Sequence, residues 1–166
     1  MKLRFAPVLC FGLLVACGEP ASENGADAGS PAAAPAASPP AASPVPALAR
    51  KPAPEGARVY IISPREGEPV TSPVTVVFGM AGAGVAPAGI VKEGTGHHHL
   101  LIDTPAPTLD APIPADERHV HFGAGQTETT ITLSPGTHTL QLLLGDELHV
   151  PHDPALMSDV VTIEVM

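Results

Sequence analysis

The stretch TTITLSPGTHTLQLLLGD, residues 129–146, decides the fold class. It contains two runs of β-branched and aliphatic residues, 129–133 and 137–144, separated by the turn-forming residues Ser134, Pro135 and Gly136. Runs of this length between turn residues are typical of β-strands. The second run has a composition that a helix would also tolerate, but its threonines and flanking turns favour a strand. The stretch therefore predicts two consecutive strands.

Further short runs of the same kind lie on both sides of this stretch. They predict strands at 59–62, 73–78, 97–103, 119–122 and 159–165. Residues 104–118 hold four prolines and are expected to form a long loop. About seven short strands with turns between them, and no amphipathic helix, are typical of a sandwich. We therefore expect an all-β, immunoglobulin-like two-sheet sandwich over residues 58–166.

The N-terminal residues have the pattern of an export signal. Lys2 and Arg4 precede an apolar run of 12 residues, 5–16, which is too short to span a bilayer as a mature helix. The last three residues of this run together with the cysteine that follows, Leu14-Val15-Ala16-Cys17, resemble the lipobox of bacterial lipoproteins. The resemblance implies cleavage after residue 16 and lipidation of Cys17, which would make the membrane a partner through the lipid anchor. Gly18, in place of the aspartate that retains such proteins at the inner membrane, suggests the outer membrane facing the periplasm.

A segment rich in alanine and proline follows the leader. Residues 18–57 contain 14 Ala and 9 Pro, which leaves little apolar surface to bury, so we expect residues 17–57 to form the lipidated cysteine and a disordered tether. The chain beyond residue 16 carries 17 acidic against 6 basic residues. This balance and the lack of a Lys/Arg cluster argue against a nucleic-acid partner. An unidentified envelope protein remains open as a partner.

All eight histidines fall between positions 97 and 152, and no cysteine lies beyond Cys17. Side chains alternate along a strand, so His97 and His99 are expected on one face of their strand, and His119 and His121 on one face of theirs. His-x-His pairs can direct two imidazole nitrogens to one metal ion. Without thiolates, such a set suits Cu(II) or Zn(II). The main candidate ligands are His97, His99, His119, His121, His149 and His152. The weaker candidates are His98, His138, Asp103 and Asp146.

Several segments together resemble a bacterial family of domains of unknown function, number 4399. The resemblance rests on residues 63–78 (SPREGEPVTSPVTVVF), 87–89 (PAG), 94–103 (GTGHHHLLID), 119–128 (HVHFGAGQTE) and 136–154 (GTHTLQLLLGDELHVPHDP). It implies domain limits and export, and no particular chemistry. The segment 119–123 (HVHFG) is also similar to the His-x-His strand of copper–zinc superoxide dismutases.

Three functions follow as hypotheses. The first is a metal-binding module for copper or zinc that needs no catalysis. It predicts that three or more imidazoles converge within about 4–5 Å, as metal–ligand distances near 2 Å require. The second is a structural or interaction module whose histidines form a hydrogen-bond network, which predicts dispersed rings or rings paired with other groups. The third is a dismutase-like metalloenzyme. No serine or cysteine nucleophile motif points to another enzyme class.

Overall fold

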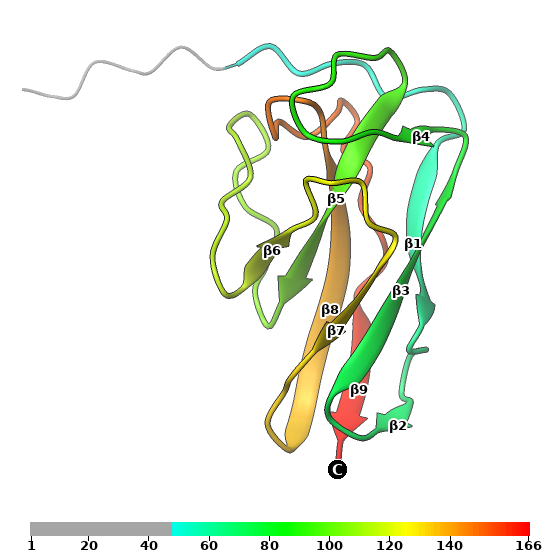
Figure 1. The fold of residues 1–166 in the computed structure, drawn as a ribbon, viewed down its shortest axis with the longest axis vertical. Helices are drawn as coiled ribbons and strands as arrows, with labels where there is room; N and C mark the ends of the chain where they lie inside the picture. The colour runs from blue at the N-terminus through cyan, green and yellow to red at the C-terminus, as the bar shows by residue number, and fades with distance from the viewer. Residues whose placement is uncertain (1–47) are drawn as a thin grey trace, which may run out of the picture. The chain divides into compact units, whose positions relative to one another are not determined.

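A computed structural model describes residues 48–166 (Figure 1). Nine strands and no helix are found in this part of the chain. The strands are β1 (Arg58–Ser63), β2 (Pro69–Val70), β3 (Val74–Ala81), β4 (Gly84–Val85), β5 (Thr95–Ile102), β6 (His119–His121), β7 (Glu128–Ile131), β8 (Gly136–Gly145) and β9 (Val161–Val165). The seven strands expected from the sequence are all present, and β2 and β4 are two-residue additions. The all-β prediction is confirmed.

The strands form two sheets, as predicted. One contains β1, β3 and β7 in that order, and the other contains β2, β9, β8, β5 and β4, with β6 also paired to β5. Strand β5 is central in the second sheet. Its one edge pairs with β8 over His97–Ile102, and its other edge pairs first with β4 and then with β6. This position gives β5 a neighbour on both edges along most of its length.

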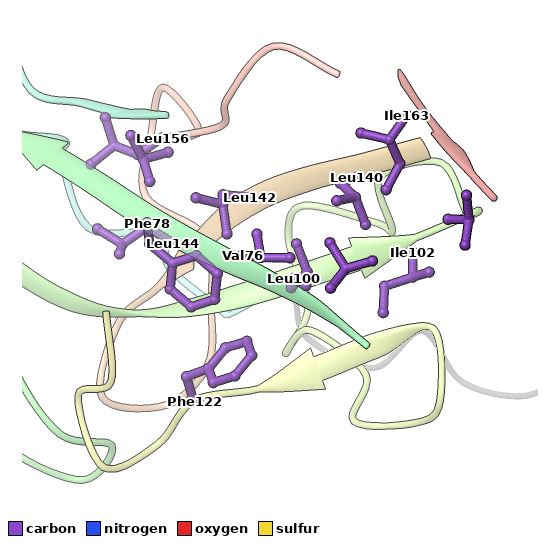
Figure 2. Packing of buried hydrophobic residues seen from close by; sticks show 13 residues of the cluster. Val76, Phe78, Leu100, Ile102, Phe122, Leu140, Leu142, Leu144, Leu156 and Ile163 are labelled. Carbon is purple, nitrogen blue, oxygen red and sulfur yellow. The ribbon is translucent and has the colours of Figure 1, made fainter. Parts of the chain in front are cut away.

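The main core lies between the two sheets (Figure 2). Alternate residues of β8 point into it, because successive side chains of a strand face opposite ways. Alternate residues of β5, which neighbours β8 in the same sheet, also point into the core, and both sets pack against alternate residues of β3 from the facing sheet. The buried residues labelled in Figure 2 are Val76, Phe78, Leu100, Ile102, Phe122, Leu140, Leu142, Leu144, Leu156 and Ile163. Leucine and valine supply most of this core, as the scarcity of aromatic residues in the sequence requires.

The outer face of β5 is also buried. Leu101 on this face packs with Leu143 of β8 and with Ile113 from the loop that joins β5 to β6. The long loop expected over 104–118 therefore covers the sheet. Strands buried on both faces lose the usual alternation of polar and apolar residues. All residues of β5 after Thr95 are buried, and this includes three consecutive histidines, His97, His98 and His99.

Residues 50–57 contact the sandwich, although the sequence analysis placed them in the tether. Ala53 and Ala57 pack against the main core, and the backbones of Lys51 and Ala53 form two hydrogen bonds with that of Asp153, at 2.7 and 2.9 Å. Arg50 donates to the backbone carbonyls of Pro151 and His152. The folded part thus begins before Arg58. The signal for this contact in the sequence was the pair of basic residues, Arg50 and Lys51, in a segment rich in alanine and proline.

The expected leader at 1–16, the lipidation site Cys17 and the tether up to residue 47 lie outside the described residues. Among the residues that the structure does describe, no helix is long and apolar enough to cross a membrane.

Candidate metal centre

Four histidine rings meet at one end of the second sheet, and we call His97, His99, His121 and His149 the histidine cluster. The Nε2 atoms of His97 and His99 lie 3.1 Å apart, and those of His121 and His149 lie 3.2 Å apart. The six pairs of ring centroids are separated by 4.7 to 5.8 Å. His97, His99 and His121 can each offer a nitrogen such that all three atoms lie within 4.8 Å of one another. These three histidines are therefore close enough to form a metal site.

Strand pairing places three of the four rings. His97 and His99 lie two residues apart on β5 and so share its outer face. In the antiparallel pairing of β5 with β6, His99 is directly opposite His121. Directly opposed residues have Cβ atoms about 4.5–5.5 Å apart. The ring centroids of His99 and His121 are correspondingly 5.0 Å apart. The register of two strands thus brings together residues that are 22 positions apart in the sequence.

His149 enters the cluster from the loop that follows β8. Its backbone adopts a conformation that is uncommon for residues other than glycine. Its φ angle is +67°, in the left-handed region. This region costs a residue other than glycine about 1–2 kcal/mol. The loop compensates with hydrogen bonds: the backbone N–H of His149 donates to the Asp146 carbonyl at 2.9 Å, and the His149 carbonyl accepts from Ile113 N–H at 2.8 Å. Strained backbone that surrounding contacts maintain is often found at functional sites.

Two glycines leave the space that the rings occupy. A Cβ atom at Gly123 would lie 2.3 Å from Cε1 of His121, which is closer than real contacts allow. A Cβ atom at Gly145 would lie 3.1 Å from Nε2 of His99 and 3.2 Å from Cα of His149. Gly145 is also the residue that pairs with His97 across β5 and β8. The sequence analysis did not single out either glycine, although both lie inside segments that it quoted, 119–128 and 136–154.

The electrostatics of the histidine cluster keep its buried rings neutral. Burial lowers the pKa of His97 to about 4, and the neighbouring imidazoles of His149 and His121 add to this effect. Burial lowers the pKa of His99 to about 2, with the same kind of contribution from His97. Burial and then His149 lower the pKa of His121. A neutral imidazole retains the nitrogen lone pair that binds a metal ion. His97, His99 and His121 are therefore in the ligand form at neutral pH.

The comparison with protein families agrees with the pattern seen in the sequence. The model described as "Domain of unknown function (DUF4399)" matches residues 76–166, more than half of the chain. The chain belongs to this family. The search of curated proteins and the search of solved structures each returned no match. All four residues of the histidine cluster lie inside the DUF4399 region, as do Gly123 and Gly145.

Three other candidate histidines of the DUF4399 region bind groups outside the cluster. His119 lies on the same face of β6 as His121, but its Nδ1 is 2.9 Å from Oδ1 of Asp116. His138 is held between Asp103, at 2.6 Å, and the carbonyl of Ser134, at 2.9 Å, and the hydrogen bond to Asp103 raises its pKa.

His98 points to the opposite side of β5, into the main core. Its ring centroid is 5.2 Å from that of Phe78, and its Nδ1 is 3.3 Å from the carbonyl of Gln126. A histidine on an apolar face that is paired with a backbone group fits a core role.

His152 and the two candidate aspartates also lie outside the set of converging rings. His152 is 1% exposed, and burial lowers its pKa, but none of the ring contacts within the histidine cluster includes it. Asp103 directly follows β5 and binds His138 and the backbone of Thr139. Asp146 accepts hydrogen bonds from the N–H groups of Leu148 and Val150, the residues on either side of His149. Asp146 thus shapes the loop that carries a cluster ring.

Proposed function

We propose that the DUF4399 domain of this protein is a binding module for one divalent transition-metal ion, held by the imidazoles of the histidine cluster, with no catalysis required. The observation that carries the proposal is the convergence of four rings from three separate segments. Around a tetrahedral ion with bonds of 2.0–2.1 Å, ligand nitrogens lie about 3.3 Å apart. The Nε2 separations of 3.1 and 3.2 Å are close to this value.

The donor set suits copper or zinc. The described residues contain no cysteine, so no thiolate is present to favour Cu(I). Imidazole nitrogens are good ligands for Zn(II), Cu(II) and Ni(II). Only one group of three or more ligand-type side chains is found within residues 48–166. This supports a site for a single ion over the two-metal centre of the dismutase-like alternative.

A purely structural hydrogen-bond network explains the histidine cluster less well. A neutral imidazole has one N–H and one lone pair. If His97 and His99 share a hydrogen bond through Nε2, the Nδ1 atoms of both rings still need partners. Both of these atoms are fully buried and have none. An unpaired buried polar group costs about 1–3 kcal/mol, so the arrangement is poor as a stabilising device.

We also propose that the domain is anchored to the cell envelope. The support is the leader sequence, in which a short apolar run ends at Cys17. Several acyl chains on one cysteine anchor a protein stably where a single chain binds only weakly. Metabolic labelling with a radioactive or clickable palmitate in the producing bacterium tests this proposal. Label in the wild-type protein and none in a Cys17→Ser variant is expected, and an unlabelled wild-type protein would exclude the anchor.

Calorimetric titration of the metal-free full-length protein with Zn(II), and separately with Cu(II), tests the metal proposal. We expect one ion per chain with a dissociation constant in the micromolar range or below. A His121→Ala/His149→Ala variant removes two half-buried cluster rings and should lose this binding. A His119→Ala/His138→Ala variant removes two half-buried rings that bind aspartates, and should retain it. No saturable binding to the wild type at micromolar concentrations would sink the proposal.

A further inference from the structure

Asp146 is a buried carboxylate next to the histidine cluster. It is 2% exposed and directly follows Gly145, the β8 residue paired with His97. Its Oδ1 accepts hydrogen bonds of 2.9 Å from the N–H groups of Leu148 and Val150. Because these two residues flank His149 in the chain, the carboxylate is fixed beside the backbone of a cluster residue.

No cation offsets the charge of Asp146 within residues 48–166. The neighbouring acid, Glu147, is paired with Lys51, and Asp153 is paired with Arg50. Asp103 and Asp116 are each paired with a histidine. Asp146 has no lysine, arginine or histidine nitrogen at ion-pair distance. Buried charges in proteins are normally paired or coordinate metals, so this carboxylate is unusual in the absence of a bound cation.

The four rings of the histidine cluster cannot supply the missing charge balance by themselves. Neutral imidazoles bring lone pairs and no net charge, whereas a divalent ion brings two positive charges into a buried site. Taking such charges out of water is costly unless opposite charge is near. The negative charge of Asp146 acts on His97, where it opposes the lowering of the pKa by burial. The carboxylate is therefore within electrostatic reach of the ligands.

We propose that Asp146 provides the countercharge for the bound metal and makes the histidine cluster prefer divalent over monovalent cations. This inference rests on the proposed metal-binding function. Asp146 is a positioning residue in this role: it fixes the His149 loop through its hydrogen bonds and acts on the metal through its charge. Coulomb energy scales with the charge of the ion, so the benefit for a divalent ion is twice that for a monovalent one.

An Asp146→Asn variant separates the two contributions of this side chain. The amide oxygen can still accept from the two N–H groups, whereas the negative charge is lost. We expect the Zn(II) dissociation constant of the full-length protein to rise about 10–100-fold, the range for residues that support metal ligands. The dissociation constant for Ag(I), measured in nitrate buffer as a monovalent probe, should rise only about 3–10-fold. A Glu147→Gln variant removes an adjacent charge that Lys51 already offsets, and should leave both constants within about twofold of the wild type.

The outcomes distinguish this inference from the proposed function. Equal losses for Zn(II) and Ag(I) in Asp146→Asn would show that the residue only shapes the loop, and would overturn the inference while leaving the metal site in place. An unchanged Zn(II) constant would do the same. A wild-type protein that binds neither ion overturns both proposals. Thermal unfolding without metal gives a second readout: Asp146→Asn should melt no lower than the wild type, because it removes a buried unpaired charge, and a lower melting temperature contradicts the inference.

Discussion

At the scale of single residues, similar histidines in this chain have different surroundings. His119 and His121 belong to one HVH motif and share a face of β6, yet only His121 contacts the histidine cluster. His149 and His152 belong to one HVPH motif, and only His149 does. Alternation along a strand correctly predicts which side chains share a face. It cannot say which of them has an aspartate such as Asp116 within reach, because that depends on how the loops fold.

His149 is the cluster residue whose replacement best separates binding from stability. A His149→Gly variant removes a ligand and also removes the strain of a φ angle of +67°. We expect metal affinity to fall at least about tenfold. Stability of the metal-free protein should be unchanged or up to about 1 kcal/mol higher, because the relief of strain outweighs the greater freedom of glycine in the unfolded chain. Urea unfolding without metal and Zn(II) titration measure the two effects. A loss of stability above 1 kcal/mol would instead assign the ring a packing role.

At the scale of elements, the sequence predicts where the strands lie along the chain, but it does not predict which strands pair with one another or in which register. The seven expected strands are confirmed, and most of them are short β-branched or aliphatic runs that end next to turn-forming residues such as Gly79, Ser134 and Gly145. The two-residue strands β2 and β4 escape prediction, since two residues carry no periodicity. The histidine cluster forms only because the pairing of β5 with β6 places His99 opposite His121. This register depends on packing across the whole sheet, which a single sequence segment does not reveal. The role of Gly123 cannot be predicted from the sequence for the same reason, because it depends on the His121 ring that lies against this glycine.

Strand β5 gives a prediction about pH, because it holds His97 and His99 neutral. Their pKa values are lowered to about 4 and about 2 in the folded protein, and each returns to about 6.5 on unfolding. At a pH between the folded and unfolded pKa values, the unfolded chain binds more protons than the folded protein. The free energy of unfolding therefore falls as the pH drops below about 6.5. Burial lowers the pKa values of three other histidines in the same direction. These are His98, His121 and His152.

His138 opposes this trend, because Asp103 raises its pKa and its contribution to stability is greatest at low pH. Five histidines outweigh one, so we expect a net loss of at least about 1.4 kcal/mol per pH unit below pH 6.5. Urea unfolding of the metal-free protein at pH 7.5, 6.5, 5.5 and 5.0 measures this slope. A flat profile over that range would mean that the rings of β5 are already protonated in the folded state.

At the scale of the whole folded unit, the segment before β1 and the loop after β8 form one structure. The segment at 48–57 runs past the end of the second sheet at which β5 begins (Figure 1), and His97 lies close to the start of that strand. Arg50 binds the backbone at Pro151 and His152, and Lys51 is paired with Glu147. These contacts lie on both sides of His149 in the chain. Arg50 and Lys51 therefore help to hold in place the loop that carries His149.

This arrangement predicts that the proposed metal site depends on residues far from it in the sequence. An Arg50→Ala/Lys51→Ala variant of the full-length protein removes side chains that contact no cluster ring. We expect a loss of about 1–3 kcal/mol of stability, from two or three hydrogen bonds at about 0.5–1.5 kcal/mol each. Zn(II) affinity should fall as well, because the 146–153 loop gains freedom that binding must then remove. Arg58→Ala and Arg65→Ala, which change two basic residues outside this contact, are the matched controls. If the double variant binds Zn(II) as tightly as these controls while losing stability, then Asp146 and Ile113 alone are enough to position His149, and the segment before β1 serves only the fold.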